Sequence, residues 1–379
     1  PAYWQSYQHV NRHFAKVVAQ EAGPNDYLWI NDYQLMNLAR ELRALDVQAP
    51  LGFFLHIPFP PPDIYHKLPW RRQVLENLLH FDLIGFQTNR HKRNFMQCVR
   101  TMIPDVKFYG KGPVTLARYG DREVRVGYFP IGIDYQSFER GAGEPAVEAM
   151  VKDLRFALRN RTVVLGVDRL DYTKGLPYKL DAMRNALRRY PELMHKISFI
   201  QVVVPSRREI PKYDELKDEI ERLVGEINGE FAQPGWVPIQ YIYRSLTRTE
   251  LLAYYRTADI ALITPLDDGM NLVAKEYCAC TIDGNGVLVL SEFAGAAAQL
   301  QRGALLVNPY NLEAVADAIH QGFTMSREER AEHMQRMRRA IANSDVFRWV
   351  GSFLEAGTEQ GLAQFPQVPG EVVREDEDF

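Results

Sequence analysis

Short apolar runs alternate with amphipathic helical patterns along most of the chain, and this alternation constrains the fold more than any other feature. Most of the runs are continuously apolar, which is typical of parallel strands covered by helices on both faces. The sequence therefore predicts an α/β fold built from β-α-β units. The expected strands are residues 27–31, 51–55, 83–87, 124–129, 162–167, 197–204, 239–243, 260–264, 287–290 and 305–307.

The length of 379 residues is too great for one ordinary hydrophobic core and predicts two Rossmann-like domains facing across a cleft. We expect the first domain at 1–140 and the second at 141–335, with helices at 336–360 packing back and a disordered acidic tail at 361–379. A linker is expected near residues 134–146, where Gly141, Gly143 and Pro145 interrupt the helical periodicity. The first domain is expected to be incomplete at its start, because the chain opens at Pro1 inside an amphipathic pattern and without an initiator Met.

The composition indicates a soluble globular protein, with 46% hydrophobic and 25% charged residues. No apolar run approaches the roughly 20 residues that cross a bilayer, and the net charge of −3 does not favour nucleic acid. Neither a membrane nor a nucleic acid is expected as a partner, whereas a homo-oligomer stays open. The three cysteines lack zinc-site partners, so we expect reduced thiols in the core of a cytoplasmic protein. No metal-ligand spacing and no glycine-rich cofactor motif occurs, so neither metal nor cofactor is expected.

Polar side chains follow several of the expected strands at the point where each strand ends. In open parallel sheets, ligands bind beyond the carboxyl ends of the strands. Five residues in two sheets share this placement and predict a site. They are Asp32, His56, Arg169, Arg207 and Asp268.

Two cations lie five residues apart in the segment at 166–175, around a turn between a strand and a helix. Arg169 offers a planar fork of donors and Lys174 a point charge near a helix start, which suits a diphosphate. Ion pairs of these cations with Asp168 and Asp171 at the surface are an equally good interpretation. The spacing alone leaves both open.

The segment at 265–276 combines a glycine turn, a carboxylate and a helix start. Gly269 permits close backbone approach, and the helix after it offers free N–H groups to an anion. Asp268 is either a ligand-binding carboxylate or a cap of this helix. Glu276 lies on an apolar helix face, where a buried carboxylate needs hydroxyl or cationic partners such as a ribose diol.

Three other candidates have alternatives of equal or greater weight. A lone histidine such as His56 is more often structural, although the proline-rich loop after it is rigid. Asp32 is as well suited to capping a helix at 35–45. Arg207 and Arg208 suit a phosphate clamp or a solvated surface.

Seven stretches taken together resemble the trehalose-6-phosphate synthases of glycosyltransferase family 20. They are residues 29–35, 56–62, 85–88, 127–134, 166–175, 265–277 and 287–297. The resemblance extends over residues 4–355 and implies a GT-B fold. It also implies an enzyme that transfers glucose from a nucleotide sugar, UDP-glucose, to glucose 6-phosphate with retention and without a metal.

The resemblance also assigns roles to individual positions. Those for the donor are Arg169, Lys174, Met270, Asn271, Leu272, Glu276 and Gln87. Arg169 and Lys174 would hold the diphosphate with the backbone at Asn271 and Leu272, and Glu276 would hold the ribose. His56 and Asp268 would hold hydroxyls of the transferred glucose. Asp32 would face the acceptor sugar and Arg207 its phosphate.

The chain departs from the family at several positions. Asn31 and Gln34 stand where many relatives have histidine, and Asp267 stands where many have arginine. The family's N-terminal stretch, which brings a glycine-containing loop and an arginine over the substrates, has no counterpart in this sequence. Two other functions therefore stay open: a sister enzyme with another acceptor (a glucosylglycerol-phosphate synthase or a pseudoglycosyltransferase) and a non-catalytic regulatory homologue.

Overall fold

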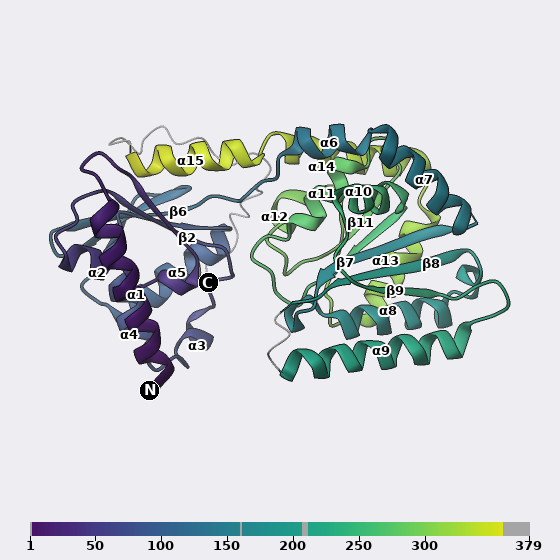
Figure 1. Ribbon diagram of the computed structural model, residues 1–379, viewed down its shortest axis with the longest axis horizontal. Helices are drawn as coiled ribbons and strands as arrows, with labels where there is room; N and C mark the ends of the chain where they lie inside the picture. The colour runs from purple at the N-terminus through teal and green to yellow at the C-terminus, as the bar shows by residue number, and fades with distance from the viewer. Residues whose placement is uncertain (1, 160, 207–210, 359–379) are drawn as a thin grey trace. The chain divides into compact units, whose positions relative to one another are not determined.

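The computed structural model describes residues 2–159, 161–206 and 211–358, which form two compact units that each contain a six-stranded sheet (Figure 1). Unit 1 contains the described residues up to Ile131 together with those from Phe347 on, and unit 2 contains Gly132–Val346. The chain therefore crosses between the units twice, after Ile131 and again after Val346. We call these the first and second crossings.

Unit 1 has a mixed sheet. Its strands are β1 (Leu28–Asn31), β2 (Leu51–Leu55), β3 (Leu83–Phe86), β4 (Lys107–Tyr109), β5 (Val114–Tyr119) and β6 (Arg122–Tyr128), in the order β1-β2-β3-β6-β5-β4. The first four of this order pair in parallel, whereas β5 and β4 pair antiparallel. The parallel sheet expected from the sequence thus carries an antiparallel edge. The sequence did not predict β4 and β5, because β4 is short and both are partly polar rather than continuously apolar.

Helices cover both faces of this sheet. They are α1 (Ala2–Glu21), η1 (Tyr33–Leu35), α2 (Leu38–Ala44), α3 (Pro62–Tyr65), α4 (Arg71–Leu78), α5 (Asn89–Met102) and α15 (Val346–Thr358). One face packs against the N-terminal helices through the main apolar cluster of the unit. The opposite face is closed by α15, whose Phe353 is buried among Phe54, Phe129 and Trp29 (Figure 1).

Unit 2 has an entirely parallel sheet. Its strands are β7 (Thr162–Arg169), β8 (Ile197–Val204), β9 (Ile239–Tyr243), β10 (Ile260–Ile263), β11 (Val287–Ser291) and β12 (Leu305–Val307), in the order β12-β11-β10-β7-β8-β9. The chain runs outward from β7 to β9, returns beside β7 and runs outward again from β10 to β12. The direction of winding therefore reverses between β7 and β10. In doubly wound sheets, ligands bind beyond the carboxyl ends of the strands at this switch point.

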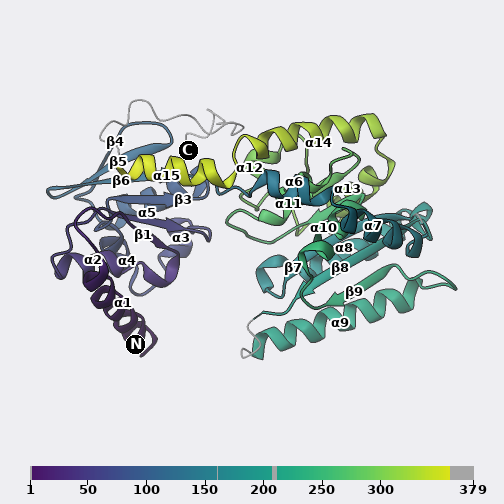
Figure 2. The same cartoon turned by 45° about the horizontal axis from the view of Figure 1, so that its top comes forward.

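Helices form a layer on each face of the second sheet (Figure 2). They are α6 (Tyr135–Ala142), α7 (Pro145–Ala157), η2 (Tyr172–Lys174), α8 (Leu176–Arg189), η3 (Pro191–Leu193), α9 (Pro211–Phe231), α10 (Arg248–Thr257), α11 (Leu272–Cys280), α12 (Ala297–Leu300), α13 (Leu312–Thr324) and α14 (Arg327–Ala342). α8, α9 and α13 pack on one face through a large apolar cluster. α10 and α11 pack on the other face, with α6, α7 and α14 against them.

The residues expected to form the linker are helical. Residues 134–146 contain α6 and the beginning of α7, and the units divide at Ile131 rather than at residue 140. Asp134 caps α6 by accepting a hydrogen bond from the Ser137 N–H at 3.0 Å, and Pro145 is the first residue of α7. The residues that suggested a linker therefore mark the end of α6, at Gly141 and Gly143, and the start of α7, at Pro145.

Two expectations about composition can be compared with the described residues. Cys98, Cys278 and Cys280 are free thiols in the core, as predicted. None of the helices in the described part of the chain combines the length and the apolar character that a membrane span requires. The acidic tail predicted at 361–379 lies outside the described residues.

Candidate active site

Residues at the switch point of unit 2 converge around one carboxylate. Asp268 follows β10, and its Oδ2 is ion-paired with the ammonium of Lys174, which is the last residue of η2 after β7. The side-chain amide of Asn271 donates to the same oxygen at 3.1 Å. The Lys174 and Asp268 side chains are 14% and 16% exposed, so the pair is mostly buried but still accessible to a ligand. We call Lys174, Asp268 and Asn271 the switch-point cluster.

Asp171 and Asp168, the carboxylates considered as alternative partners for the cations, bind other groups. Asp171 accepts hydrogen bonds from the Thr173 N–H at 3.0 Å and from its hydroxyl at 2.9 Å. Asp168 pairs with Lys179. The alternative of an ion pair between Lys174 and Asp168 or Asp171 is therefore wrong. Arg169 lies exposed at the end of β7, beside the switch point.

A buried ion pair that the sequence did not predict supports the end of β7. Lys179 Nζ lies 2.6 Å from Asp168 Oδ2, and the Gln201 amide donates to the same oxygen at 3.0 Å. All three side chains are buried, so each partner satisfies a group that would otherwise be costly. The pair joins strand β7 to helix α8 and thereby fixes the backbone that carries Arg169.

The start of α11 is capped by Asn271 rather than by Asp268. The Asn271 Oδ1 accepts from the Ala274 N–H at 3.2 Å, and the residue has a positive φ of 74°. Such a conformation is uncommon outside glycine and persists where the surroundings hold it. The backbone N–H of Gly295 donates to the Asp268 carbonyl at 3.0 Å and pins the loop in place. The capping alternative for Asp268 is therefore wrong.

Met270 and Leu272 flank this cap. The Met270 side chain is buried, and its carbonyl accepts from the Ala296 N–H at 2.7 Å. Leu272 is the first residue of the nine-residue helix α11. N–H groups in the first turn of a helix lack intrahelical partners and carry a partial positive charge. This helix start can therefore receive an anion beside Lys174.

Glu276 lies farther along α11 and is largely enclosed. Its Oε2 accepts a hydrogen bond at 2.7 Å from the hydroxyl of Tyr255, a fully buried residue of α10. Burial raises the pKa of Glu276 above its ordinary value, and the Tyr255 hydrogen bond opposes this in part. Among the described residues, Oε1 has no hydrogen-bond donor. A ligand hydroxyl is a suitable partner for this oxygen.

His56 of unit 1 lies at the carboxyl edge of the first sheet. Its Nδ1 is 3.5 Å from the amide nitrogen of Gln87, whose Oε1 accepts from the Ile131 N–H at 3.0 Å. Because this amide nitrogen is a donor, Nδ1 acts as acceptor and the proton lies on Nε2, 3.0 Å from Asn31 Oδ1. Burial lowers the pKa of His56, and the charge of Asp32 opposes this in part. The ring is therefore neutral near pH 7.

Asp32 lies beside this histidine. Its φ is 71°, and its Oδ1 is 3.4 Å from the His56 backbone nitrogen, which donates to it. The side chain makes no capping hydrogen bond to the helical turn at Tyr33–Leu35. Asp32 therefore belongs with His56 and not with a helix start, so the capping alternative is wrong.

The structure thus brings most of the predicted site residues together within each unit. Unit 1 contains one contacting group, formed by Asp32, His56 and Gln87. In unit 2, the switch-point cluster lies on the segments that follow β7 and β10, at the start of α11. Arg207 falls outside the described residues. Across the described ranges, no group of three or more histidine, cysteine or carboxylate side chains has the arrangement of a metal site.

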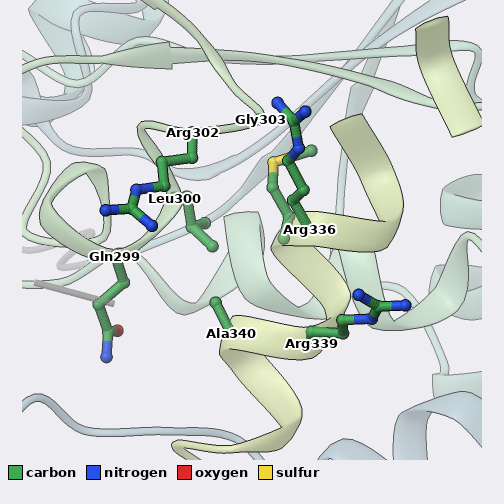
Figure 3. A pocket seen from close by; sticks show the side chains of 8 residues that line it. Gln299, Leu300, Arg302, Gly303, Arg336, Arg339 and Ala340 are labelled. Atoms are coloured by element: carbon green, nitrogen blue, oxygen red, sulfur yellow. The ribbon is translucent and has the colours of Figure 1, made fainter. Parts of the chain in front are cut away.

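A hollow of about 550 Å³ lies elsewhere in unit 2, between α12 and α14. Figure 3 shows three arginines around it, Arg302, Arg336 and Arg339, whose side chains extend in different directions. Arg336 is also ion-paired with Glu332 on its own helix. None of the predicted site residues lines this hollow, and its arginines do not converge on one point.

Known proteins resemble nearly the whole chain. A bifunctional trehalose-6-phosphate synthase/phosphatase from Thermoproteus tenax is 44% identical over 355 residues, which cover 93% of this chain and 48% of that protein. A solved α,α-trehalose-phosphate synthase (UDP-forming) from Burkholderia xenovorans in complex with glucose-6-phosphate is 34% identical, with a TM-score of 0.89 over 93% of this chain and 77% of that one. A structure from E. coli bound with UDP-2-fluoro glucose is 36% identical, with a TM-score of 0.89 over 94% and 78%.

These comparisons establish the fold and the family. The likeness to the solved structures confirms the predicted GT-B class. The chain spans about half the length of the Thermoproteus tenax relative. The model of glycosyltransferase family 20 matches residues 1–358. The chain belongs to glycosyltransferase family 20.

Proposed function

We propose that this protein transfers glucose from UDP-glucose to glucose 6-phosphate with retention and so forms trehalose 6-phosphate. The observation that carries the proposal is the switch-point cluster at the start of α11, with Glu276 on the same helix. Membership of glycosyltransferase family 20 supports it, as do the relatives with glucose-6-phosphate and UDP-2-fluoro glucose bound.

Helix α11 has a layout that suits a nucleoside diphosphate. Asn271 and Glu276 are five residues apart, which corresponds to a rise of about 7.5 Å along the helix. A diphosphate at the helix start would meet free N–H groups, and the ribose attached to it would reach Glu276. The unused Oε1 of Glu276 would then accept from a ribose hydroxyl. We assign the donor to these residues together with Arg169 and the backbone at Met270 and Leu272.

Fixed positive charge would stabilise the departing diphosphate. An ammonium group has three N–H donors, and Lys174 gives one of them to Asp268. The other two, with Arg169 and the start of α11, are left for phosphate oxygens. Such preorganised donors act most strongly where charge develops in the transition state. Asp268 would hold Lys174 in position and bind a hydroxyl of the transferred glucose.

The proposed step is a displacement on one face of the sugar. The bond between C1 of glucose and the diphosphate oxygen breaks, and the electron pair stays on that oxygen. The anomeric hydroxyl oxygen of glucose 6-phosphate bonds to C1 from the same face, and its proton passes to the departing phosphate oxygen. Asp268 is already engaged by Lys174 and Asn271, which makes it a poor nucleophile. Trapping of a glucosyl adduct on Asp268 or Asp32 would overturn this step.

We assign the acceptor side to unit 1 and to Arg207. His56 is neutral, so it would bind a glucose hydroxyl, in exchange for one of its ring contacts with Asn31 and Gln87, rather than act as a cation. Asp32 would bind the acceptor sugar beside it. Arg207 is predicted to bind the acceptor phosphate.

One residue, Asn31, supports an alternative in which the acceptor is not glucose 6-phosphate. Asn31 hydrogen-bonds directly to His56 at 3.0 Å, and many relatives have histidine at this position. An amide cannot acquire the positive charge that a histidine can, so the charge beside His56 differs from that in those relatives. A related enzyme with another phosphorylated acceptor, such as glycerol 3-phosphate, is therefore the alternative.

The experiment is an assay of UDP release by the full-length protein. UDP-glucose and, in parallel, other glucose nucleotides are offered with glucose 6-phosphate, with glycerol 3-phosphate and with no acceptor, and release of the nucleoside diphosphate is measured. We expect release with glucose 6-phosphate above the rate without acceptor. Absence of release with every glucose nucleotide and acceptor would reject the enzymatic proposal, and tight UDP binding without turnover would identify a regulatory homologue. A cytoplasmic location and a homo-oligomer stay predictions.

A further inference from the structure

A buried lysine links helix α11 to the second crossing. Lys275 is fully buried, and its Nζ donates to Gln299 Oε1 at 2.6 Å. The Gln299 amide in turn donates to the hydroxyl of Ser344 at 3.3 Å. Ser344 is two residues from the end of unit 2. The side chain before Glu276 on α11 is thus connected to the segment that leaves the unit.

The two crossings lie side by side where they join unit 2. The backbone N–H of Val346 donates to the carbonyl of Ile133 at 3.0 Å. A Cβ at Gly132 would lie 2.3 Å from the backbone carbon of Asp345, closer than any side chain tolerates. The close approach therefore requires glycine at this position. Movement of one crossing must involve the other.

The C-terminal end of α11 is connected to the first crossing. The guanidinium of Arg338 donates to the carbonyls of Cys278 at 2.9 Å and Ala279 at 2.6 Å, which satisfies free carbonyls of the last turn. The same guanidinium pairs with Glu139 at 2.6 Å. Glu139 lies on α6, which begins just after the first crossing. Helices α6, α11, α12 and α14 are neighbours in both views (Figures 1 and 2).

Contacts within unit 1 continue from the first crossing to the histidine. The N–H of Ile131, the last residue of unit 1 before the crossing, donates to Gln87 Oε1 at 3.0 Å. The amide nitrogen of Gln87 lies 3.5 Å from His56 Nδ1. A continuous series of contacts and peptide bonds therefore runs from α11 to His56.

We propose that Lys275 is a positioning residue that couples helix α11, through Gln299 and Ser344, to the paired crossings and from there to Gln87 and His56. The inference rests on the proposed function, because it assumes that α11 binds the donor. In this arrangement, donor binding at α11 orders the crossings and sets the orientation of His56.

Stability alone does not account for a lysine at this position. Burial lowers the pKa of Lys275 to about 7, which shows that the buried ammonium is unfavourable. Lys275→Met removes the cost of the buried ammonium but leaves Gln299 Oε1 without its donor, so the two effects oppose each other. Because burying the ammonium is the larger cost, Lys275→Met should melt no lower than the wild type near neutral pH. This separates a coupling role from a packing role.

The experiment compares the full-length wild type with Lys275→Met and Ser344→Ala. Lys217→Met is the matched control, because Lys217 forms a surface ion pair with Glu221. UDP affinity is measured by calorimetry, and amide hydrogen exchange at 131–133 and 344–346 is measured with and without UDP. Melting temperature, kcat and KM complete the set.

We expect UDP to slow exchange at both crossings in the wild type and in Lys217→Met. In Lys275→Met, UDP should still bind and the melting temperature should not fall, but the slowing at 131–133 should be lost. A misplaced His56 should lower kcat about 100-fold with little change in KM. Ser344→Ala should show the same pattern to a smaller extent.

The outcomes separate this inference from the proposed function. If the wild type does not bind UDP, the donor assignment is wrong, and the inference that rests on it is wrong too. If the wild type binds UDP and both variants retain its exchange pattern and kcat, the coupling role is overturned while the proposed function stands. Loss of melting temperature and activity together in Lys275→Met, with Ser344→Ala unchanged, identifies a packing role and also overturns the inference.

Discussion

Replacing Glu276 by glutamine tests the assignment of the ribose site. The Oε2 atom already accepts from the Tyr255 hydroxyl at 2.7 Å, which leaves Oε1 for a ribose hydroxyl. A hydrogen bond to a charged group contributes about 1.5–3 kcal/mol. Its loss in Glu276→Gln should weaken UDP binding by about 10- to 150-fold. The amide is nearly isosteric, so the helix itself should be retained.

Calorimetry with two ligands separates the ribose from the diphosphate. UDP contains both groups, whereas inorganic pyrophosphate lacks the ribose. Glu276→Gln should lose affinity for UDP and keep its affinity for pyrophosphate. Lys217→Met, altered in a surface ion pair, serves as the control and should bind both ligands as the wild type does.

The pH dependence of UDP affinity gives a second signature. Burial raises the pKa of Glu276 above 4.5, and its ionised form accepts hydrogen bonds from hydroxyls. Wild-type affinity should therefore fall as pH decreases through the raised pKa, and this decrease should be absent in Glu276→Gln. The raised pKa has the opposite effect on folding: protonation of the native state adds stability at low pH, and that contribution is lost as pH rises through the raised pKa. Equal loss of UDP and pyrophosphate affinity, or no loss of either, would refute the assignment.

Three further changes have defined outcomes. Lys174→Met should lower kcat for UDP release about 100- to 1000-fold, and an unchanged kcat would exclude Lys174 from the departing diphosphate. Gly166→Ala would place a Cβ 2.3 Å from Gln201 Oε1 and should cost about 1–3 kcal/mol, visible in thermal melts as a lower melting temperature. Because burial lowers the pKa of Lys275 from 10.5 to about 7, the wild type should gain about 5 kcal/mol relative to Lys275→Met as pH rises across that window in urea titrations. If the free energy of unfolding changes with pH in the same way for the wild type and Lys275→Met, the lowered pKa of Lys275 is contradicted.

The fold of unit 2 could be predicted well because its strands are mainly apolar runs between polar loops, and inner strands such as β8, β10 and β11 are buried on both faces. The runs at Ile197–Val204, Ile239–Tyr243 and Leu305–Val307 have the predicted bounds, since a mainly apolar segment ends where polar loop residues begin. The same signal fails for β4 and β5, because these two partly polar strands of the antiparallel part of the sheet resemble loops in the sequence.

The site was predicted as a set of residue types at strand ends, but not as contacts. Lys174 and Asp268 are 94 residues apart, and their contact depends on β7 and β10 being neighbours. Strand order is set by packing of the whole sheet, so spacing along the sequence could not choose between Asp268 and the nearer Asp168 as the partner of Lys174. The family resemblance pointed to the segments of both residues without giving that ion pair.

The supporting residues were missed for the same reason. Lys179 and Gln201 hold Asp168 from a helix and a neighbouring strand, and Lys275 reaches Gln299 on another helix. Each is a polar residue within an apolar pattern, and such residues usually indicate solvent exposure. The signal available in the sequence was a lysine within an apolar helix pattern, at a position where a core residue is expected.

NMR of the product formed by the full-length protein from UDP-glucose and glucose 6-phosphate is the most direct test of the proposed retaining transfer. The two anomeric protons report the configuration at both linked carbons. We predict a single disaccharide phosphate with both carbons in the α configuration, formed in equal amount with UDP. A β linkage at the transferred glucose, or glucose release without a disaccharide, would contradict the proposed chemistry.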